Sequence, residues 1–152
     1  TDVSKDYPDI TFEEMYVDAC AMNLIRQPEQ FDVVVTTNLF GDILSDESSQ
    51  VVGGLGMAPA ANIGDNFALF EPVHGAAFDI AGQNIANPSS FLLSIKMMLD
   101  WLGAKHNDSK CLEVGTKLES TIFDLVKSGV KTKDIGGDAT TVEFTKHITD
   151  NL

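Results

Sequence analysis

The sequence has one arginine, two cysteines and no apolar run of the length that a membrane-spanning helix needs, about 20 residues. Cys20 and Cys111 have no CxxC or Cys/His spacing around them, so neither a zinc site nor a disulfide framework is predicted, and both are interpreted as buried thiols. Because Arg26 is the only arginine, this chain alone cannot form a bidentate arginine clamp for a di- or tricarboxylate.

Positive charge in general is scarce. Ten Lys and Arg stand against 23 Asp and Glu, which gives a formal net charge of −13. A protein of this charge repels phosphate groups, so nucleic acid and anionic membranes are excluded as partners. Residues 1–9 also lack the basic and then apolar pattern of a secretory signal, and we expect a cytoplasmic protein.

The first third of the chain alternates between helical and strand patterns. Apolar residues at three- and four-residue spacing predict a helix over 12–25, with Thr11 or a near neighbour as its cap. The β-branched run 31–35 predicts a buried strand, and a second helix is expected from about residue 41 to residue 52. This order is typical of an α/β fold, with a parallel or mixed sheet flanked by helices.

The remainder begins with small residues and turn formers, so 53–64 is interpreted as a loop or domain crossing. A short strand is expected at 68–70. The next helix, 89–102, is apolar nearly all round, which predicts a position in the centre of a core or at an interface. Two further helices are expected, one over 111–126 and one that begins near Thr140.

Three local signals fix the ends of these helices. Asn87-Pro88 is a typical helix start, with Asn at the cap position. Gly129 suits the left-handed position that follows a helix. Thr140 and Glu143 have the spacing of a capping box.

Asp42 and Asp46 are four residues apart, so on a helix both carboxylates project from one face. A hard divalent cation such as Mg²⁺ or Mn²⁺ would relieve their repulsion and accept their oxygens as ligands. From spacing alone, a solvated acidic helix face is the favoured interpretation, because acidic pairs at this separation are common on protein surfaces. Asp18, also on a predicted helix, carries no signal by itself.

His74 and Asp79 lie in a loop of small residues, where polar side chains often serve function. A carboxylate at Asp79 can accept both hydroxyls of a ribose, or it can simply stabilise a turn. The glycines of 53–56 do not form a dinucleotide fingerprint, because Met-Ala-Pro follows and no third glycine opens a helix.

Taken in order, several segments of the chain resemble the isocitrate and isopropylmalate dehydrogenase family. The segments that carry the resemblance are Tyr16-Val17-Asp18-Ala19, Asn38 to Glu47, Gly53-Gly54-Leu55-Gly56, Glu71-Pro72-Val73-His74-Gly75, Asp79-Ile80-Ala81-Gly82 and Ala86-Asn87-Pro88. The resemblance implies the carboxy-terminal portion of a two-domain fold of that family. Residues 1–52 would belong to the small dimerisation domain and residues 53–152 to the large cofactor-binding domain.

The resemblance also implies a divalent metal site and a homodimer or higher homo-oligomer. Asp42 and Asp46 look like the metal-binding aspartates of one subunit. Asp18 looks like the aspartate that reaches the metal of the neighbouring subunit. Mg²⁺ or Mn²⁺ is the ion expected there.

The loop that follows residue 70 looks like the family's pocket for the adenosine half of NAD. Asp79 stands where NAD-using members carry an acid, which would repel the 2'-phosphate of NADP. Ala76 and Phe78 depart from the more usual small polar residue and proline. The residues that the resemblance assigns to this pocket are Glu71, His74, Gly75, Ala76, Ala77, Asp79, Ile80 and Asn87.

The implied activity is the NAD-linked oxidative decarboxylation of a small-molecule 2-hydroxy acid. Isocitrate is favoured by the runs 52–59 and 61–64, with 3-isopropylmalate as the alternative and tartrate or homoisocitrate also open. The family's catalytic lysine and tyrosine, its arginine cluster and its substrate loop precede the matching region. We therefore expect no catalytic residue in this chain and little activity from it alone; a non-catalytic, nucleotide-binding subunit is the second hypothesis.

Overall fold

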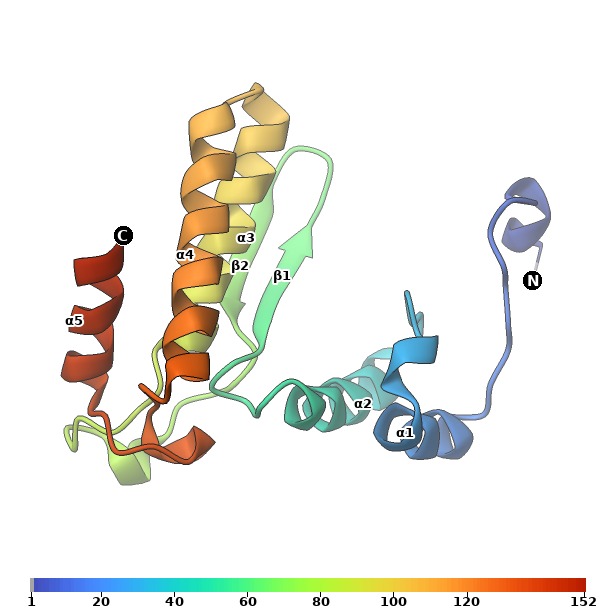
Figure 1. Cartoon of the computed structure of the whole chain (residues 1–152). Coiled ribbons are helices and arrows are strands. Elements are labelled where there is room, and N and C mark those ends of the chain that lie inside the picture. Colours follow the sequence, from blue (N-terminus) through green and yellow to red (C-terminus); the bar gives the residue numbers. More distant parts are fainter. Residues whose placement is uncertain (1) are drawn as a thin grey trace. The chain divides into compact units, whose positions relative to one another are not determined.

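The structure is a computed structural model that describes residues 2–152, and it separates into two compact units at the peptide bond between Val51 and Val52 (Figure 1). This boundary falls one residue from the predicted one. The assignment of the units to a dimerisation and a cofactor domain stays a prediction.

The first unit is a pair of helices with short connections. Its elements are the 3-10 turn η1 (Val3–Asp6), helix α1 (Val17–Arg26), the 3-10 turn η2 (Pro28–Gln30) and helix α2 (Asn38–Val51). The two helices pack through Cys20, Leu24 and Leu44, with Phe31 partly buried against them. Three buried side chains make a small core for a unit of this length.

Two predictions for this unit are wrong. The first helix begins at Val17 rather than at residue 12. Tyr16 rather than Thr11 stands at its cap position, and no side chain makes a capping hydrogen bond there. Residues 31–35 form no strand, since no other described segment pairs with them. Val33 and Val35 are 80% and 92% exposed, so the apolar run lacks the neighbours that it would need for burial.

The second unit is built around a helical hairpin. Its elements are strands β1 (Pro59–Ile63) and β2 (Ala68–Pro72), the 3-10 turn η3 (Phe78–Ile80), helices α3 (Ser89–His106) and α4 (Ser109–Ser128), the 3-10 turn η4 (Lys133–Ile135) and helix α5 (Thr141–Asn151). Helix α3 contacts both strands and α4, and α5 packs against α4 (Figure 1). The central position predicted for 89–102 is confirmed.

The core of this unit gathers apolar side chains from three helices and the loop before β1. Phe144 and Ile122 are fully buried. The buried members of the core are Met57, Leu93, Leu118, Ile122, Phe144 and Ile148. Burying one large apolar side chain contributes roughly 1.5–3 kcal/mol, so α5, which supplies two of these residues, is a firm part of the unit.

The sheet is a two-stranded antiparallel hairpin in which Pro59 pairs with Pro72 and Ile63 with Ala68. Strand β1 lies inside the stretch predicted as a loop, and no larger mixed sheet occurs within residues 2–152. Two serines of α3 attach the hairpin to the helix. Ser90 Oγ donates to the carbonyl of Ala58 at 2.5 Å, and Ser94 Oγ donates to that of Glu71 at 2.7 Å.

The hairpin turn is held by the far end of α3. Lys105 Nζ donates to the carbonyl of Asn66 at 2.6 Å and lies 4.2 Å from the centroid of the Trp101 ring. Trp101 in turn lies against Phe70, with ring centroids 6.2 Å apart. A cation over an aromatic face is attracted by the ring quadrupole, so the turn, the lysine and the two rings stabilise one another.

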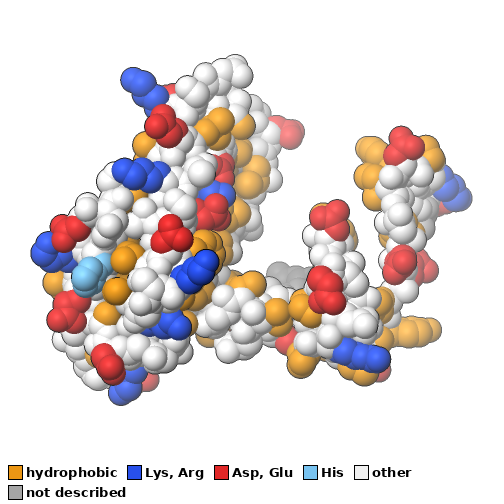
Figure 2. All heavy atoms as spheres, in the orientation of Figure 1, with side chains coloured by type: hydrophobic (Ala, Val, Ile, Leu, Met, Phe, Trp, Pro, Cys, Tyr) orange, Lys and Arg blue, Asp and Glu red, His pale blue; other side chains and the backbone are white. Residues whose placement is uncertain are grey.

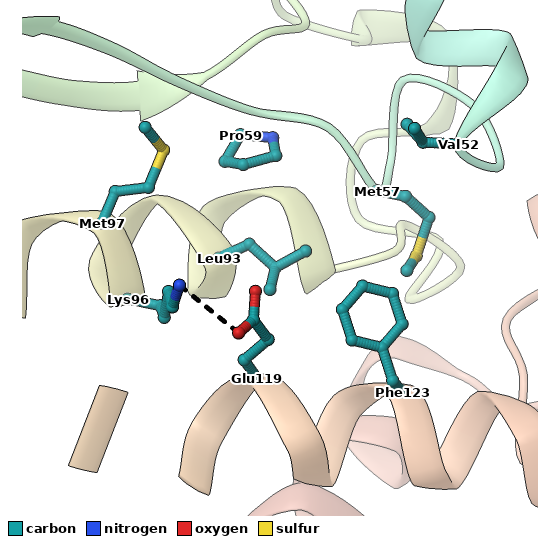
Figure 3. Close-up of a pocket in the computed structure, with 8 residues that line it drawn as sticks. All are labelled: Val52, Met57, Pro59, Leu93, Lys96, Met97, Glu119 and Phe123. Carbon is teal, nitrogen blue, oxygen red and sulfur yellow. Dashed lines mark ion pairs between the residues drawn. The ribbon is translucent and has the colours of Figure 1, made fainter. Parts of the chain in front are cut away.

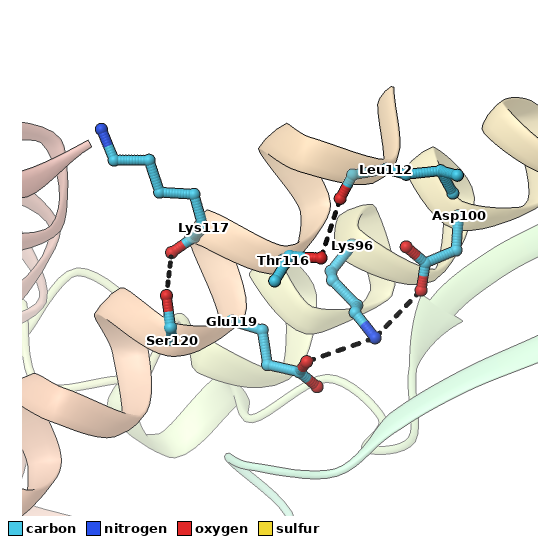
Figure 4. A network of polar contacts seen from close by, with 7 residues as sticks. All are labelled: Lys96, Asp100, Leu112, Thr116, Lys117, Glu119 and Ser120. Atoms are coloured by element: carbon cyan, nitrogen blue, oxygen red, sulfur yellow. Dashed lines mark hydrogen bonds and ion pairs between the residues drawn. The ribbon is translucent and has the colours of Figure 1, made fainter. Parts of the chain in front are cut away.

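Helices α3 and α4 approach closely and share one ion-pair network. Lys96 Nζ lies 2.9 Å from Asp100 and 3.3 Å from Glu119 across the helix pair (Figure 4). The hydrogen bond to Asp100 is the main reason that the pKa of Lys96 is raised, although partial burial opposes it. A Cβ on Gly103 would lie 2.7 Å from Leu112, so glycine permits this helix spacing.

Two of the three helix ends predicted for this unit are confirmed, and the third is displaced by one residue. Gly129 ends α4 with φ of 97°, and Thr140 and Glu143 form a reciprocal capping box on α5. Asn87 accepts a hydrogen bond from the amide of Ser89, although the helix itself starts at Ser89, after Pro88. Among the described residues, no helix has the length and hydrophobicity that crossing a membrane requires.

Candidate functional site

The candidate metal site begins with two exposed carboxylates on α2. Leu44 is buried against α1, and Asp42 and Asp46 each lie two residues from it. Residues two positions apart are separated by about 200° around the helix axis, so both aspartates lie on the face opposite the α1 contact. Neither carboxylate has a hydrogen-bond or ion-pair partner in the described part of the chain, and the pair therefore fits an oxygen-seeking divalent cation.

Asp18 does not complete this site within the chain. It lies in the first turn of α1, two residues before the buried Cys20, and its Oδ1 accepts from the amide of Ala19 at 2.9 Å. The described residues contain no group of three His, Cys, Asp or Glu side chains that could hold a metal ion. A third carboxylate ligand would have to come from residues outside this arrangement.

The candidate cofactor site is a groove in the second unit. The loop 73–87, between β2 and α3, and the segment 132–142, before and at the start of α5, provide its walls. Its volume is about 990 Å³, at the upper end of the range for small-molecule sites. The side chains that line it are mostly apolar, among them Leu55, Ile80, Ile85 and Val142.

The structure brings six of the eight predicted cofactor residues to this groove. They are His74, Gly75, Ala76, Ala77, Ile80 and Asn87. His74 Nδ1 lies 3.0 Å from the carbonyl of Gly75; because a carbonyl only accepts, Nδ1 carries the proton in this contact. Apolar walls with a few polar groups suit a flat base and its sugar. Whether these residues contact NAD stays a prediction.

Glu71 and Asp79 do not line the groove. Glu71 lies in β2, where its carboxylate accepts from Asn62 Nδ2 at 3.2 Å across the hairpin. Asp79 is exposed in η3, directly before Ile80 of the groove wall, and its backbone carbonyl accepts from Gln83 at 2.7 Å. Its carboxylate has no partner in the described part of the chain and is available to a ligand there.

Sequence reasoning missed the second wall of the groove. Asp134 accepts from Asn87 Nδ2 at 3.0 Å and from Thr132 Oγ1 at 2.6 Å, which places a carboxylate inside the groove. A Cβ on Gly56 would lie 2.6 Å from this carboxylate and 3.0 Å from Asn87, so a side chain at position 56 would force Asp134 to move. The contact between Asn87 and Asp134 spans 47 positions, and no local pattern signals it.

The second unit has another, smaller cavity of about 320 Å³ (Figure 3). It lies between the start of β1, α3 and α4, and its lining is apolar except for the ion pair of Lys96 and Glu119. Both members of that pair are engaged with each other, so the cavity presents no free charge to a ligand. None of the predicted site residues lines it.

Comparison with solved structures defines the class of protein. The chain superposes with a TM-score of 0.90 on an isocitrate dehydrogenase from Methylococcus capsulatus, at 40% identity over 99% of this chain and 43% of that one. A β-decarboxylating dehydrogenase from Thermococcus kodakarensis gives a TM-score of 0.81 at 37% identity. The fold is thus the α/β fold of decarboxylating dehydrogenases, of which this chain covers the carboxy-terminal part.

Sequence comparison agrees. The family model described as isocitrate/isopropylmalate dehydrogenase matches residues 1–152, and the chain belongs to this family. It is 57% identical to a 3-isopropylmalate dehydrogenase of Saccharolobus solfataricus over 86% of the chain, and 50% identical to an isocitrate/homoisocitrate dehydrogenase of Thermus thermophilus over 99%. The chain spans 39% and 43% of the length of these two relatives.

Proposed function

We propose that this chain supplies the metal-binding helix and the adenosine groove of an NAD-dependent dehydrogenase that oxidatively decarboxylates a 2-hydroxy acid. The observation that carries the proposal is the groove. Six residues assigned to the cofactor by family resemblance line it together, although they come from a loop with little regular structure. Membership in a family of decarboxylating dehydrogenases supports the reaction class.

The proposed reaction consumes only the 2-hydroxy acid and NAD. Hydride passes from the hydroxyl-bearing carbon of the substrate to the nicotinamide, and the hydroxyl proton goes to a base, which leaves a keto acid. The bond between the neighbouring carbon and its carboxylate then breaks, and CO2 departs. The electron pair that remains takes up a proton at that carbon, so the proton lost at the hydroxyl is recovered.

The residues of this chain bind and orient rather than transfer protons. Asp42 and Asp46 would hold the cation, which when bound supplies Lewis acidity at the substrate oxygens. The apolar groove would exclude water around the adenosine half of NAD and fix its position. We propose NAD rather than NADP because the free carboxylate of Asp79 would repel a 2'-phosphate.

The substrate that we propose is a malate with a substituent at carbon 3. The names of the relatives at 57% and 53% identity, both 3-isopropylmalate dehydrogenases, favour 3-isopropylmalate. The isocitrate preference of the sequence analysis is supported by a relative at 50% identity and by one solved structure. The relatives therefore make 3-isopropylmalate the first substrate to test and isocitrate the second.

We also propose that the active form is a homodimer or a higher homo-oligomer. Asp42 and Asp46 face away from α1, which carries Asp18, so one copy of this chain does not gather the three carboxylates. A second copy that presents its Asp18 to the free face of α2 would complete an oxygen-rich metal site.

The test is an assay of NADH formation by the full-length protein with Mg²⁺, with 3-isopropylmalate and isocitrate in parallel and with NADP as the matched alternative acceptor. Activity with one acid, lost on chelation and weak with NADP, is the expected result. Activity with neither acid would overturn the enzyme proposal. If NAD still bound, the chain would instead belong to a nucleotide-binding subunit.

A further inference from the structure

The groove loop is tied to helix α5 by three hydrogen bonds. The backbone carbonyl of Asn84 accepts from the amide of Thr141 at 3.0 Å, and Asn84 Oδ1 accepts from the amide of Val142 at 3.1 Å. Thr141 Oγ1 donates to the carbonyl of Ala86 at 2.5 Å. These residues are 55 to 58 positions apart in pairs, and all four line the groove. We call this set the Asn84 clasp.

The clasp uses amides that a helix cannot satisfy by itself. The first amides of an α-helix have no partner within the helix. Thr140 Oγ1 accepts from the amide of Glu143, as in an ordinary capping box, which leaves the amides of Thr141 and Val142 to Asn84. The start of α5 therefore has a local cap and a remote cap, and the remote one lies in the groove loop.

The backbone of Asn84 is shaped for this role. Its φ is 57°, in the left-handed region that asparagine tolerates better than most residues. That conformation turns its carbonyl and its side chain toward the same helix end, so both contact neighbouring amides. A residue that only ended a turn would not need two acceptors aimed at a distant helix.

The two sides of the clasp differ in how firmly they are held. Helix α5 is anchored by Phe144 and Ile148, which are 0% and 2% exposed in the core. In the loop, η3 is the only helical turn, and the residues from His74 to Asp79 are exposed. The hydrogen bonds of the clasp therefore hold the loop against the anchored helix α5. In this way they set the distance between the two walls of the groove.

We propose that Asn84 is a positioning residue for the cofactor, and that the Asn84 clasp holds the groove at the width that binds the adenosine half of NAD. This inference rests on the proposed function, because it assumes that the groove takes NAD. Without the clasp, the loop would spend part of its time in arrangements that do not bind. The observed affinity would fall by that fraction, while the reacting groups would be unchanged.

The test compares substitutions in the full-length enzyme. Asn84→Gly keeps the left-handed backbone and the carbonyl acceptor but removes the bond to Val142. Thr141→Val removes the hydroxyl bond to Ala86 at equal size, and Thr141→Ser restores it. Asn107→Gly is the matched control, because Asn107 also has a left-handed backbone, φ 53°, but ends α3 away from the groove.

Asn84→Gly and Thr141→Val should each raise KM for NAD, and the dissociation constant for AMP, by about fivefold, the change expected from one lost hydrogen bond. The kcat at saturating NAD should stay within about twofold, as should every constant of Thr141→Ser and Asn107→Gly. A purely structural role would lower the melting temperature and leave KM and the AMP constant unchanged.

Three results would overturn the inference, and the first is distinguishable from the other two. If the unchanged protein binds neither NAD nor AMP, the proposed function fails and the clasp fails with it. If the unchanged protein is saturated by NAD but Asn84→Gly has an unaltered KM, or Asn107→Gly raises KM equally, the clasp alone is wrong.

Discussion

The two units of the chain differ in how they are held together. The second buries six apolar side chains in one core, whereas the first buries three between two helices and leaves Tyr16, Val33 and Val35 more than three-quarters exposed. Hydrophobic side chains reach the surface in both units (Figure 2). The first unit thus carries the candidate metal ligands on a thin core, and the second carries the groove on a well-packed one, so changes in each should have different effects.

The sharpest test of this contrast is the removal of a core side chain. Phe144→Ala leaves a large cavity in the second unit and should destabilise it by about 3–5 kcal/mol. The measurement is equilibrium unfolding in denaturant, followed by circular dichroism. Phe78→Ala, at a side chain that is 86% exposed, is the control and should change stability by less than about 0.5 kcal/mol. Equal effects would contradict the packing described for α5.

The first unit should respond through its charges instead. Asp42→Asn removes one carboxylate from α2, and the dissociation constant for Mg²⁺ should rise at least about 10- to 100-fold, the range known for loss of a mere supporting partner. Isothermal titration of the full-length protein would measure it. Glu47→Gln removes a charge from the same helix without touching the pair. If Glu47→Gln raises the dissociation constant for Mg²⁺ equally, the negative charge of the helix as a whole, rather than chelation by the two aspartates, attracts the ion.

A glycine pair tests the groove in the second unit. Gly56→Ala would place a methyl group 2.6 Å from Asp134 and 3.0 Å from Asn87, and overpacking of this kind costs about 1–3 kcal/mol. Gly75→Ala meets no atom within 4 Å. Thermal unfolding should show a loss for Gly56→Ala alone. A similar loss of stability in both variants would mean that the conformational freedom of glycine, rather than crowding of Asp134 and Asn87, determines the effect.

The smallest expected effect is the pH dependence of α5. Hydrogen bonds from the backbone amide and hydroxyl of Thr140 hold the pKa of Glu143 below its usual range. A lowered pKa in the folded state means that the stabilisation is present above the ordinary glutamate value, about 4.3, and is lost as pH falls through the folded pKa. Glu143→Gln should flatten the decline in melting temperature below pH 5; an unchanged slope would exclude this contribution.

The parts of the fold that the sequence predicted are those set by local chemistry. Gly129 and the Thr140 and Glu143 box each act within a few residues and were found where expected. Asn87 accepts from the amide of Ser89, although the helix begins one residue later than predicted. The strand at 31–35 failed because pairing depends on a distant partner that the described residues do not provide. Strand β1 was missed because its small residues and proline are typical of a turn.

The candidate sites divide in the same way. The pair on α2 follows from helical spacing, and the groove loop follows from an ordered set of short segments. Asp134 and the start of α5 enter the groove through contacts 47 to 58 positions apart, so only the folded chain reveals them. The expected role of Asp18 depends on a second copy of the chain, so the fold of a single copy does not place it at the metal site.

The lysine that holds the hairpin turn has a practical consequence for labelling. Exposed turns between strands are ordinarily safe places for an epitope or a fluorophore. Here the carbonyl of Asn66 is engaged by Lys105, which also lies over Trp101, so an insertion between Gly64 and Phe67 would disturb the indole environment. Tryptophan emission would then report damage to the turn, since Trp101 is the only tryptophan in the sequence.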